Sequence, residues 1–277
     1  MKDFAGKVVA ITGAGSGIGR ALAVEFAGRD AHLALSDIDA DGLASTADLC
    51  QRANVEVATH VVDVADRAAV MAWADQVAER HDRVNLIVNN AGVTVAATAA
   101  QVTVDDFEWL MGINFWGVVH GTQAFLPHLK ASGDGHVVNI SSVFGLVSIP
   151  AQSTYNAAKF AVRGFSDALR MELEIERADV SVTTIHPGGI RTGIARNARL
   201  DASFSDVGGD VSTFGQEFDR IARTTPERAA RQIIRSVERN RRRALIGPDA
   251  KVFDLVSRLP ARFYQQVLVA DGRRRLG

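Results

Sequence analysis

Three residues of this sequence have the types and spacing needed for acid–base chemistry on an oxygen atom: Ser142, Tyr155 and Lys159. Tyr155 and Lys159 lie four positions apart, so they share one face of a predicted helix. The apolar run 137–140 predicts a buried strand ending at the serine, whose hydroxyl can then face the phenol. A neighbouring ammonium favours the phenolate, so the tyrosine can exchange a proton with an alcohol or ketone oxygen. The alternative is a packed helix tyrosine beside a solvated lysine.

A glycine-rich turn follows the first predicted strand, residues 7–12, and precedes a helix expected over 20–29. A strand, a glycine turn and a helix N-terminus together form a cradle for a pyrophosphate, because backbone N–H groups and a partial positive charge meet the ligand. The turn is spaced Gly-x-x-x-Gly-x-Gly, which differs from the standard Gly-x-Gly-x-x-Gly, and the alternative is a flexible turn. The residues expected to bind cofactor here are Gly13, Ser16, Gly17, Ile18 and Gly19.

Asp37 ends the second predicted strand, 32–36, and lies 18 residues after the last glycine of the turn. A carboxylate near this position accepts hydrogen bonds from the adenine ribose hydroxyls and repels a 2′-phosphate. No lysine or arginine follows it directly, so NAD is expected rather than NADP. An N-cap role for the helix that starts near Asp39 is the alternative and is compatible with ribose binding.

Further predicted strands, 55–62 and 84–88, run into Asp63-Val64 and into Asn89-Asn90-Ala91-Gly92. Alternating strands and helices imply right-handed crossovers and a parallel sheet, with ligands bound at the carboxyl ends of the strands. The fold class is therefore α/β, a Rossmann-like doubly wound parallel sheet with helices on both faces. The cofactor residues expected at these strand ends are Asp63, Val64, Asn90, Ala91 and Gly92.

The second half of the chain continues this pattern and then weakens. Helices are predicted over 103–129, which contains Asn114, and over 152–177, followed by a strand over 180–185. Residues 193–223 lack periodicity, which is typical of a lid or binding loop. A helix with an arginine-rich solvated face follows from Pro226, then a short strand at 244–247 and a terminal amphipathic helix over 248–270 that Pro260 can break. Arg273 to Arg275 are expected to be a disordered tail.

Composition narrows the classes of function. The chain has 277 residues and a net charge of -1, so no global field favours nucleic acid or an acidic membrane. Cys50 is the only cysteine, which excludes a disulfide framework within the chain, and the seven histidines show no paired metal spacing. No apolar run reaches the roughly 18 residues of a membrane span. We expect one domain over 1–277, with a substrate lid at 193–225 and C-terminal helices and tail at 226–277.

Taken together, these motifs resemble those of the short-chain dehydrogenase/reductase family over about the first 195 residues. Ser142 rather than Ser141 takes the family's catalytic place, because the family's serine lies thirteen residues before its tyrosine. From Gly193 onward the match is loose. The matching motifs are the Gly13/Gly17/Gly19 turn, Asp63-Val64, Asn89-Asn90-Ala91-Gly92, Asn114, Ser142, Tyr155-x-x-x-Lys159 and Pro187-Gly188 through Thr192.

The resemblance implies roles for these positions. Tyr155 acts as general acid/base, Ser142 orients the substrate oxygen, and Lys159 lowers the tyrosine pKa and binds the nicotinamide ribose. Asn114 holds a water in a proton relay. The alternative interpretation of Asn114 is an exposed amide on the helix surface. Hydride passes between NAD(H) and a secondary alcohol or ketone. The resemblance further implies cofactor contacts from Pro187, Gly188, Ile190, Thr192, Tyr155 and Lys159.

The expected substrate site is apolar and uncharged, which favours a neutral steroid, lipid-derived or xenobiotic carbonyl. Its expected lining comprises Ser142, Val143, Phe144, Leu146, Gln152, Tyr155 and Gly189, with Val93, Thr94 and the lid. We expect a cytoplasmic homotetramer or homodimer, on resemblance. Two alternatives remain open: an NADP-dependent carbonyl reductase, and a nucleotide-binding regulatory protein without turnover.

Overall fold

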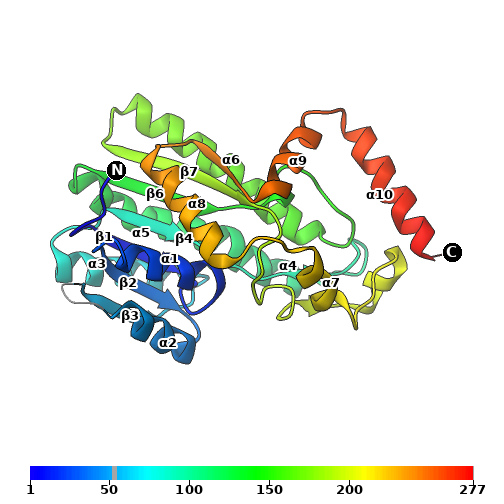
Figure 1. Ribbon diagram of the computed structural model, residues 1–277, viewed down its shortest axis with the longest axis horizontal. Helices are drawn as coiled ribbons and strands as arrows, with labels where there is room; N and C mark the ends of the chain where they lie inside the picture. The colour runs from blue at the N-terminus through cyan, green and yellow to red at the C-terminus, as the bar shows by residue number, and fades with distance from the viewer. Residues whose placement is uncertain (52–54, 277) are drawn as a thin grey trace.

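The structure is a computed structural model that describes residues 1–51 and 55–276. At its centre lies a seven-stranded parallel sheet in the order β3-β2-β1-β4-β6-β7-β9 (Figure 1). The sheet strands are β1 (Val8–Thr12), β2 (His32–Asp37), β3 (Val57–Val61), β4 (Leu86–Asn89), β6 (Gly135–Ile140), β7 (Val180–Pro187) and β9 (Arg243–Ile246). The order reverses beside β1, so the carboxyl ends of β1 and β4 open a crevice there.

Helices cover both faces of this sheet, which confirms the predicted fold class. They are α1 (Gly17–Ala27), α2 (Ala40–Cys50), α3 (Arg67–His81), α4 (Val104–Met111), α5 (Gly117–Ala131), α6 (Ser153–Ile175), α7 (Phe214–Ile221), α8 (Pro226–Glu238), α9 (Pro248–Ser257) and α10 (Ala261–Leu276). Phe26 of α1 and Ile233 of α8 belong to the core on one face. Trp73 of α3, Phe125 of α5 and Leu169 of α6 belong to the core on the other.

Side-chain caps fix where several helices begin. Asp39, Asp66, Thr103 and Thr225 each accept a backbone N–H from the first turn of α2, α3, α4 and α8. Such caps satisfy N–H groups that have no partner inside the helix. The cap of α2 is therefore Asp39, which excludes the capping role considered for Asp37.

The predicted helix over 103–129 is wrong in one respect. It is divided into α4, a π-helical turn (Gly112–Trp116) and α5, and it extends to Ala131. A π-turn inserts one extra residue per turn and rotates the following helix, a change that hydrophobic periodicity does not reveal. The turn contains Asn114, which is fully buried, so the exposed-amide alternative is wrong.

The segment after Gly193 is more ordered than its pattern suggests. It contains β8 (Arg199–Leu200), a 3-10 helix (Ala202–Val207) and α7, and β8 pairs in parallel with β5 (Val95–Ala96). The Arg199 guanidinium lies 3.5 Å from the centroid of the Trp109 ring and 2.7 Å from Asp106 of α4. These contacts hold the segment against α4.

The C-terminal region also differs from the prediction. Helix α9 ends before Pro260, as the sequence indicated, but α10 runs on to Leu276 and includes the three arginines assigned to a disordered tail. Asp271 forms ion pairs with Arg274 and Arg275 within this helix, as i,i+3 and i,i+4 neighbours. In the described part of the chain, no helix is both long and apolar enough to cross a bilayer.

Candidate active site

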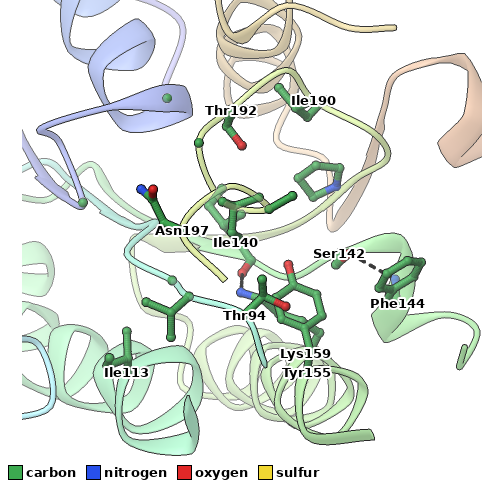
Figure 2. Close-up of a pocket in the computed structure, with 18 of the residues that line it drawn as sticks. Thr94, Ile113, Ile140, Ser142, Phe144, Tyr155, Lys159, Ile190, Thr192 and Asn197 are labelled. Atoms are coloured by element: carbon green, nitrogen blue, oxygen red, sulfur yellow. Dashed lines mark hydrogen bonds between the residues drawn. The ribbon is translucent and has the colours of Figure 1, made fainter. Parts of the chain in front are cut away.

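The three residues singled out for acid–base chemistry line one cavity, together with the glycine turn and the ends of β4 and β7. Ser142 follows β6, whereas Tyr155 and Lys159 lie on α6, and Figure 2 shows all three side chains in the same region of the site. Lys159 Nζ lies 5.5 Å from the centroid of the Tyr155 ring and donates a hydrogen bond of 3.0 Å to the carbonyl of Ile140. The helical spacing therefore places phenol and ammonium side by side.

Burial is the main cause of the pKa shifts of Tyr155 and Lys159. Burial raises the pKa of Tyr155 to about 12, and a hydrogen bond with the Ser142 side chain acts in the opposite direction. The phenol keeps partial exposure, yet it lines the cavity rather than the outer surface. Burial also lowers the pKa of Lys159 to about 8. The expectation that the neighbouring ammonium sets the tyrosine pKa is thus corrected: desolvation of the phenolate outweighs it.

Asn114 is tied to the backbone beside this cluster. Its Oδ1 accepts from the N–H of Val93 and its Nδ2 donates to the carbonyl of Val93, each at 2.8 Å. A Cβ built on Gly92 would lie 3.3 Å from Asn114 Oδ1 and 3.7 Å from Lys159 Nζ. Asn114 therefore holds the loop that follows β4 close to the lysine. The water relay implied by the resemblance stays a prediction.

The two serines after β6 have different surroundings. Ser141 Oγ donates to the backbone carbonyl of Lys159 at 2.8 Å and is buried, so it holds the loop to α6. Ser142 Oγ accepts from the N–H of Phe144 at 3.1 Å and lines the cavity. The Ser142 carbonyl is 2.8 Å from Nδ1 of His186, a buried residue of β7 whose pKa burial lowers to about 4. A neutral imidazole donating from Nδ1 therefore fixes this loop, which the sequence did not indicate.

The glycine turn has the geometry of a phosphate cradle. Gly13 and Gly17 have positive φ angles of 64° and 53°. A Cβ on Gly13 would press on Ala91, and one on Gly17 would approach Thr192, so side chains there would fill the space the turn leaves open. The N-cap of α1, Ser16, makes no side-chain cap hydrogen bond, which leaves N–H groups of the first turn available to an anion. These features fit a dinucleotide pyrophosphate.

Other predicted cofactor residues lie around this turn. Ser16, Gly17 and Ile18 line the cavity, whereas Gly19 is buried and lies against the Gly13 carbonyl, so it permits close packing of α1 rather than ligand contact. Asn90 Nδ2 donates to the carbonyls of Thr12 and Gly13 at 3.0 and 3.1 Å. The amide thereby holds the turn against the end of β4.

Asp37, at the end of β2, lies directly beside the glycine turn. Its Oδ2 accepts from the N–H of Gly15 at 2.8 Å and its Oδ1 from the N–H of Asp39 at 3.1 Å. It lines the cavity with Asp63 and Val64, which follow β3. The carboxylate is therefore oriented by the turn itself and faces the site with a negative charge.

The loop after β7 forms the opposite wall. Pro187, Gly188, Gly189, Ile190 and Thr192 line the cavity, and Figure 2 shows Ile190 and Thr192 on this loop above the lysine and tyrosine. Thr224 pairs with the loop, since its N–H donates to the Gly189 carbonyl and its carbonyl accepts from Arg191.

The cavity has a volume of about 1000 Å³ and extends beyond the predicted cofactor positions. Val143, Phe144 and Gln152 line it as expected, but Leu146 is buried outside its lining. Gln152 Oε1 accepts from the Thr94 hydroxyl at 3.0 Å. Pattern reasoning missed the individual lining residues Trp109, Phe204, Phe214, Phe218, Ile221, Asp249, Phe253 and Arg275. The aromatic residues scattered after Gly193 were the available signal.

The family model described as "short chain dehydrogenase" matches residues 7–203, the segment that contains every motif of the site before the lid. The chain belongs to this family. It is therefore an oxidoreductase of the short-chain dehydrogenase family, and the predicted resemblance is confirmed.

Several named relatives support this assignment. The chain is 49% identical over 271 residues to "Putative oxidoreductase SadH" of Mycobacterium tuberculosis, covering 98% of this chain and 96% of that protein. It is 33% identical to "Dehydrogenase/reductase SDR family member 7B" of Xenopus tropicalis, covering 86% of this chain and 76% of the relative. The similarity therefore extends past the lid into the C-terminal helices.

Solved structures agree in fold. A short-chain dehydrogenase/reductase from Burkholderia phymatum in complex with NAD superposes with a TM-score of 0.86 at 31% identity, covering 96% of each chain. Levodione reductase superposes with a TM-score of 0.78 at 30% identity, covering 90% of this chain and 99% of that one. The arrangement of layers described above is thus that of the family.

Proposed function

We propose that this protein transfers hydride between NAD(H) and a secondary alcohol or ketone. The observation that carries the proposal is the convergence of Ser142, Tyr155 and Lys159 on a cavity whose other end is a glycine turn followed by Asp37. A bound nicotinamide cofactor supplies the hydride donor or acceptor, and the protein contributes position and proton transfer.

Tyr155, Ser142 and Lys159 have different roles in the proposed reaction. In the reducing direction Tyr155, whose phenol stays protonated at neutral pH, donates its proton to the substrate oxygen, which Ser142 holds by a hydrogen bond. The Lys159 ammonium, beside the ring, stabilises the phenolate that remains. In the oxidising direction the Tyr155 phenolate accepts the alcohol proton, so this direction requires the phenol to lose its own proton first. Asn114 and Gly92 support the lysine side of the cluster.

We infer that NAD is the cofactor and that the substrate is neutral and apolar. The negative charge of Asp37 next to the turn opposes a 2′-phosphate, and the family neighbour from Burkholderia phymatum was crystallised with NAD. The substrate end of the cavity is walled by Trp109, Phe204 and Phe253, which favours a steroid, lipid-derived or xenobiotic carbonyl. Residues 193–225 are its proposed lid, within one domain over 1–277.

We also propose a cytoplasmic homotetramer or homodimer that associates through α4–α5 and α6. Trp116, Met171 and Ile175 expose 51%, 54% and 82% of their surface along these helices, more than large apolar side chains usually leave in water. Sedimentation of the purified protein tests this.

Cofactor titration and one substitution test the function. NADH is expected to bind more tightly than NADPH to the purified protein, by fluorescence titration, and tighter binding of NADPH would reject the role given to Asp37. Tyr155→Phe is expected to reduce the rate on any accepted alcohol by about 10²–10⁴-fold while leaving NADH affinity within about twofold.

The matched control is Tyr264→Phe, which changes the other of the two tyrosines, a residue of α10 whose oxygen lies 3.5 Å from the Ser148 N–H. This variant should keep turnover. If Tyr155→Phe turns over every accepted substrate at the wild-type rate, the acid–base role is wrong. If the wild-type protein binds a reduced cofactor but oxidises no secondary alcohol in a broad panel, the regulatory alternative gains support.

A further inference from the structure

A carboxylate from the C-terminal region lies directly against the loop that follows β7. Asp249 Oδ2 accepts a hydrogen bond of 2.6 Å from the N–H of Gly189. A Cβ built on Gly188 would overlap the Asp249 carboxylate, so the loop and the acid approach each other as closely as a glycine allows. Asp249 also lines the cavity, and Phe253, on the next turn of α9, does the same.

The position of this acid is set by the edge of the sheet. Strand β9 pairs with β7, and the Gly188 N–H continues that pairing by donating to Ile246 at 3.0 Å. The chain then turns at Gly247, which has a φ of 95°, and enters α9 at Pro248 (Figure 1). The first turn of α9 is thereby brought over the loop, with the Asp249 side chain directed at its backbone.

The strength of the contact follows from its chemistry. A hydrogen bond to an ionised carboxylate is roughly twice as strong as a neutral one. Backbone bonds join the loop to Ile246 and Thr224, and the Arg191 side chain donates to the Ala222 carbonyl at 2.9 Å. Asp249 is the charged side chain bonded directly to Gly189, the residue that precedes Ile190.

We propose that Asp249 is a positioning residue for the cofactor-binding loop 187–192, so that α9 controls the affinity of the site for the nicotinamide half of the cofactor. This inference rests on the proposed function, because it takes the loop as the part of the site that meets nicotinamide. The acid orders the loop before the cofactor arrives, and this reduces the entropy that binding must otherwise overcome.

A purely structural role makes a different prediction. Asp249 also lies in the first turn of α9, where a negative charge stabilises a helix by interaction with its dipole. Loss of that interaction alone would lower the melting temperature of the protein and leave cofactor affinity unchanged. Cofactor affinity and thermal stability must therefore be measured on the same variants.

The experiment compares two probes on the full-length protein: NADH, and ADP-ribose, which lacks the nicotinamide. Asp249→Ala is expected to weaken NADH binding about tenfold, because it removes a hydrogen bond to a charged group, and to leave ADP-ribose binding within about twofold. Asp249→Asn retains an uncharged acceptor and is expected to weaken NADH binding about threefold. Asp254→Asn, on the same helix and ion-paired with Arg258, is the matched control and should bind both probes as the wild type does.

Two results would overturn the inference: NADH binding to both Asp249 variants within twofold of the wild type, or an equal loss for NADH and ADP-ribose. Should the alanine variant fail to fold, the asparagine variant provides the same comparison. Failure of the proposed function looks different, since it shows in the wild-type protein itself, which would then bind no nicotinamide cofactor, prefer NADPH, or oxidise no secondary alcohol.

A double substitution adds an independent check. Gly188→Ala should weaken NADH binding strongly in the wild type, because the new Cβ overlaps the carboxylate. In an Asp249→Ala background that overlap is gone, so Gly188→Ala should reduce NADH affinity several-fold less than it does in the wild type. Additive losses would show that the two groups do not restrain each other.

Discussion

Lys159→Met is expected to stabilise the folded protein at neutral pH while removing its activity. The wild-type side chain is 3% exposed, and burial lowers its pKa from 10.5 to about 8. Because each tenfold change in proton affinity corresponds to roughly 1.4 kcal/mol, keeping this group protonated inside the fold costs about 3 kcal/mol at pH 7. Methionine removes that cost but also the charge-assisted hydrogen bond to Ile140, worth about 2 kcal/mol. The net gain in the free energy of unfolding is therefore about 1 kcal/mol.

The pH dependence separates this effect from a general change in packing. Between pH 8 and 10.5 the unfolded chain binds a proton at Lys159 that the folded protein has released, so wild-type stability should rise with pH in this window. Tyr155 acts oppositely above pH 10, where the unfolded phenol ionises first and stability falls until about pH 12. Urea unfolding of the wild type and the methionine variant from pH 7 to 9.5 therefore isolates the lysine as the difference between the two curves, because groups common to both cancel, and the variant should lack the rise that Lys159 causes.

An exposed lysine supplies the control. Lys251→Met, on the outer surface of α9, should change neither the stability at pH 7 nor its slope with pH by more than about 0.5 kcal/mol. If Lys159→Met is less stable than the wild type at pH 7, or shows the same slope from pH 8 to 9.5, the desolvation argument for the site is refuted.

Two further substitutions probe the packing that supports the site. Asn114→Ala leaves the Val93 N–H and carbonyl without their side-chain partner in a partly buried position and should lower the free energy of unfolding by about 1–3 kcal/mol in urea titrations. Gly121→Ala introduces a Cβ that overlaps the Asn89 side-chain amide in the core. It should lower the free energy of unfolding by about 1–3 kcal/mol. Its control is Gly164→Ala on α6, where nothing lies within 4 Å and the better helix propensity should be neutral or stabilising. Equal effects of the two alanines would contradict the packing argument.

Local spacing explains why most of the site could be predicted from the sequence. Tyr155 and Lys159 share a helix face wherever that helix lies, and the glycines at 13 and 17 allow positive φ angles in any surroundings. Alternating strands and helices imply a parallel sheet, whose carboxyl strand ends bring the motifs together. The fold class, the family and the location of the crevice depend only on such short-range patterns.

Burial and long-range contact were decided by the tertiary structure. The sequence pairs a phenol with an ammonium, but the packing of α6 against the sheet buries the ammonium, leaves the phenol only partly exposed, and reverses the expected direction of the tyrosine pKa shift. Asn114 of the π-turn bonds to Val93, 21 residues away, and the Asp249 contact joins positions 60 residues apart. Neither solvation nor contact between distant segments is encoded in periodicity, because both depend on which surfaces meet after the chain has folded.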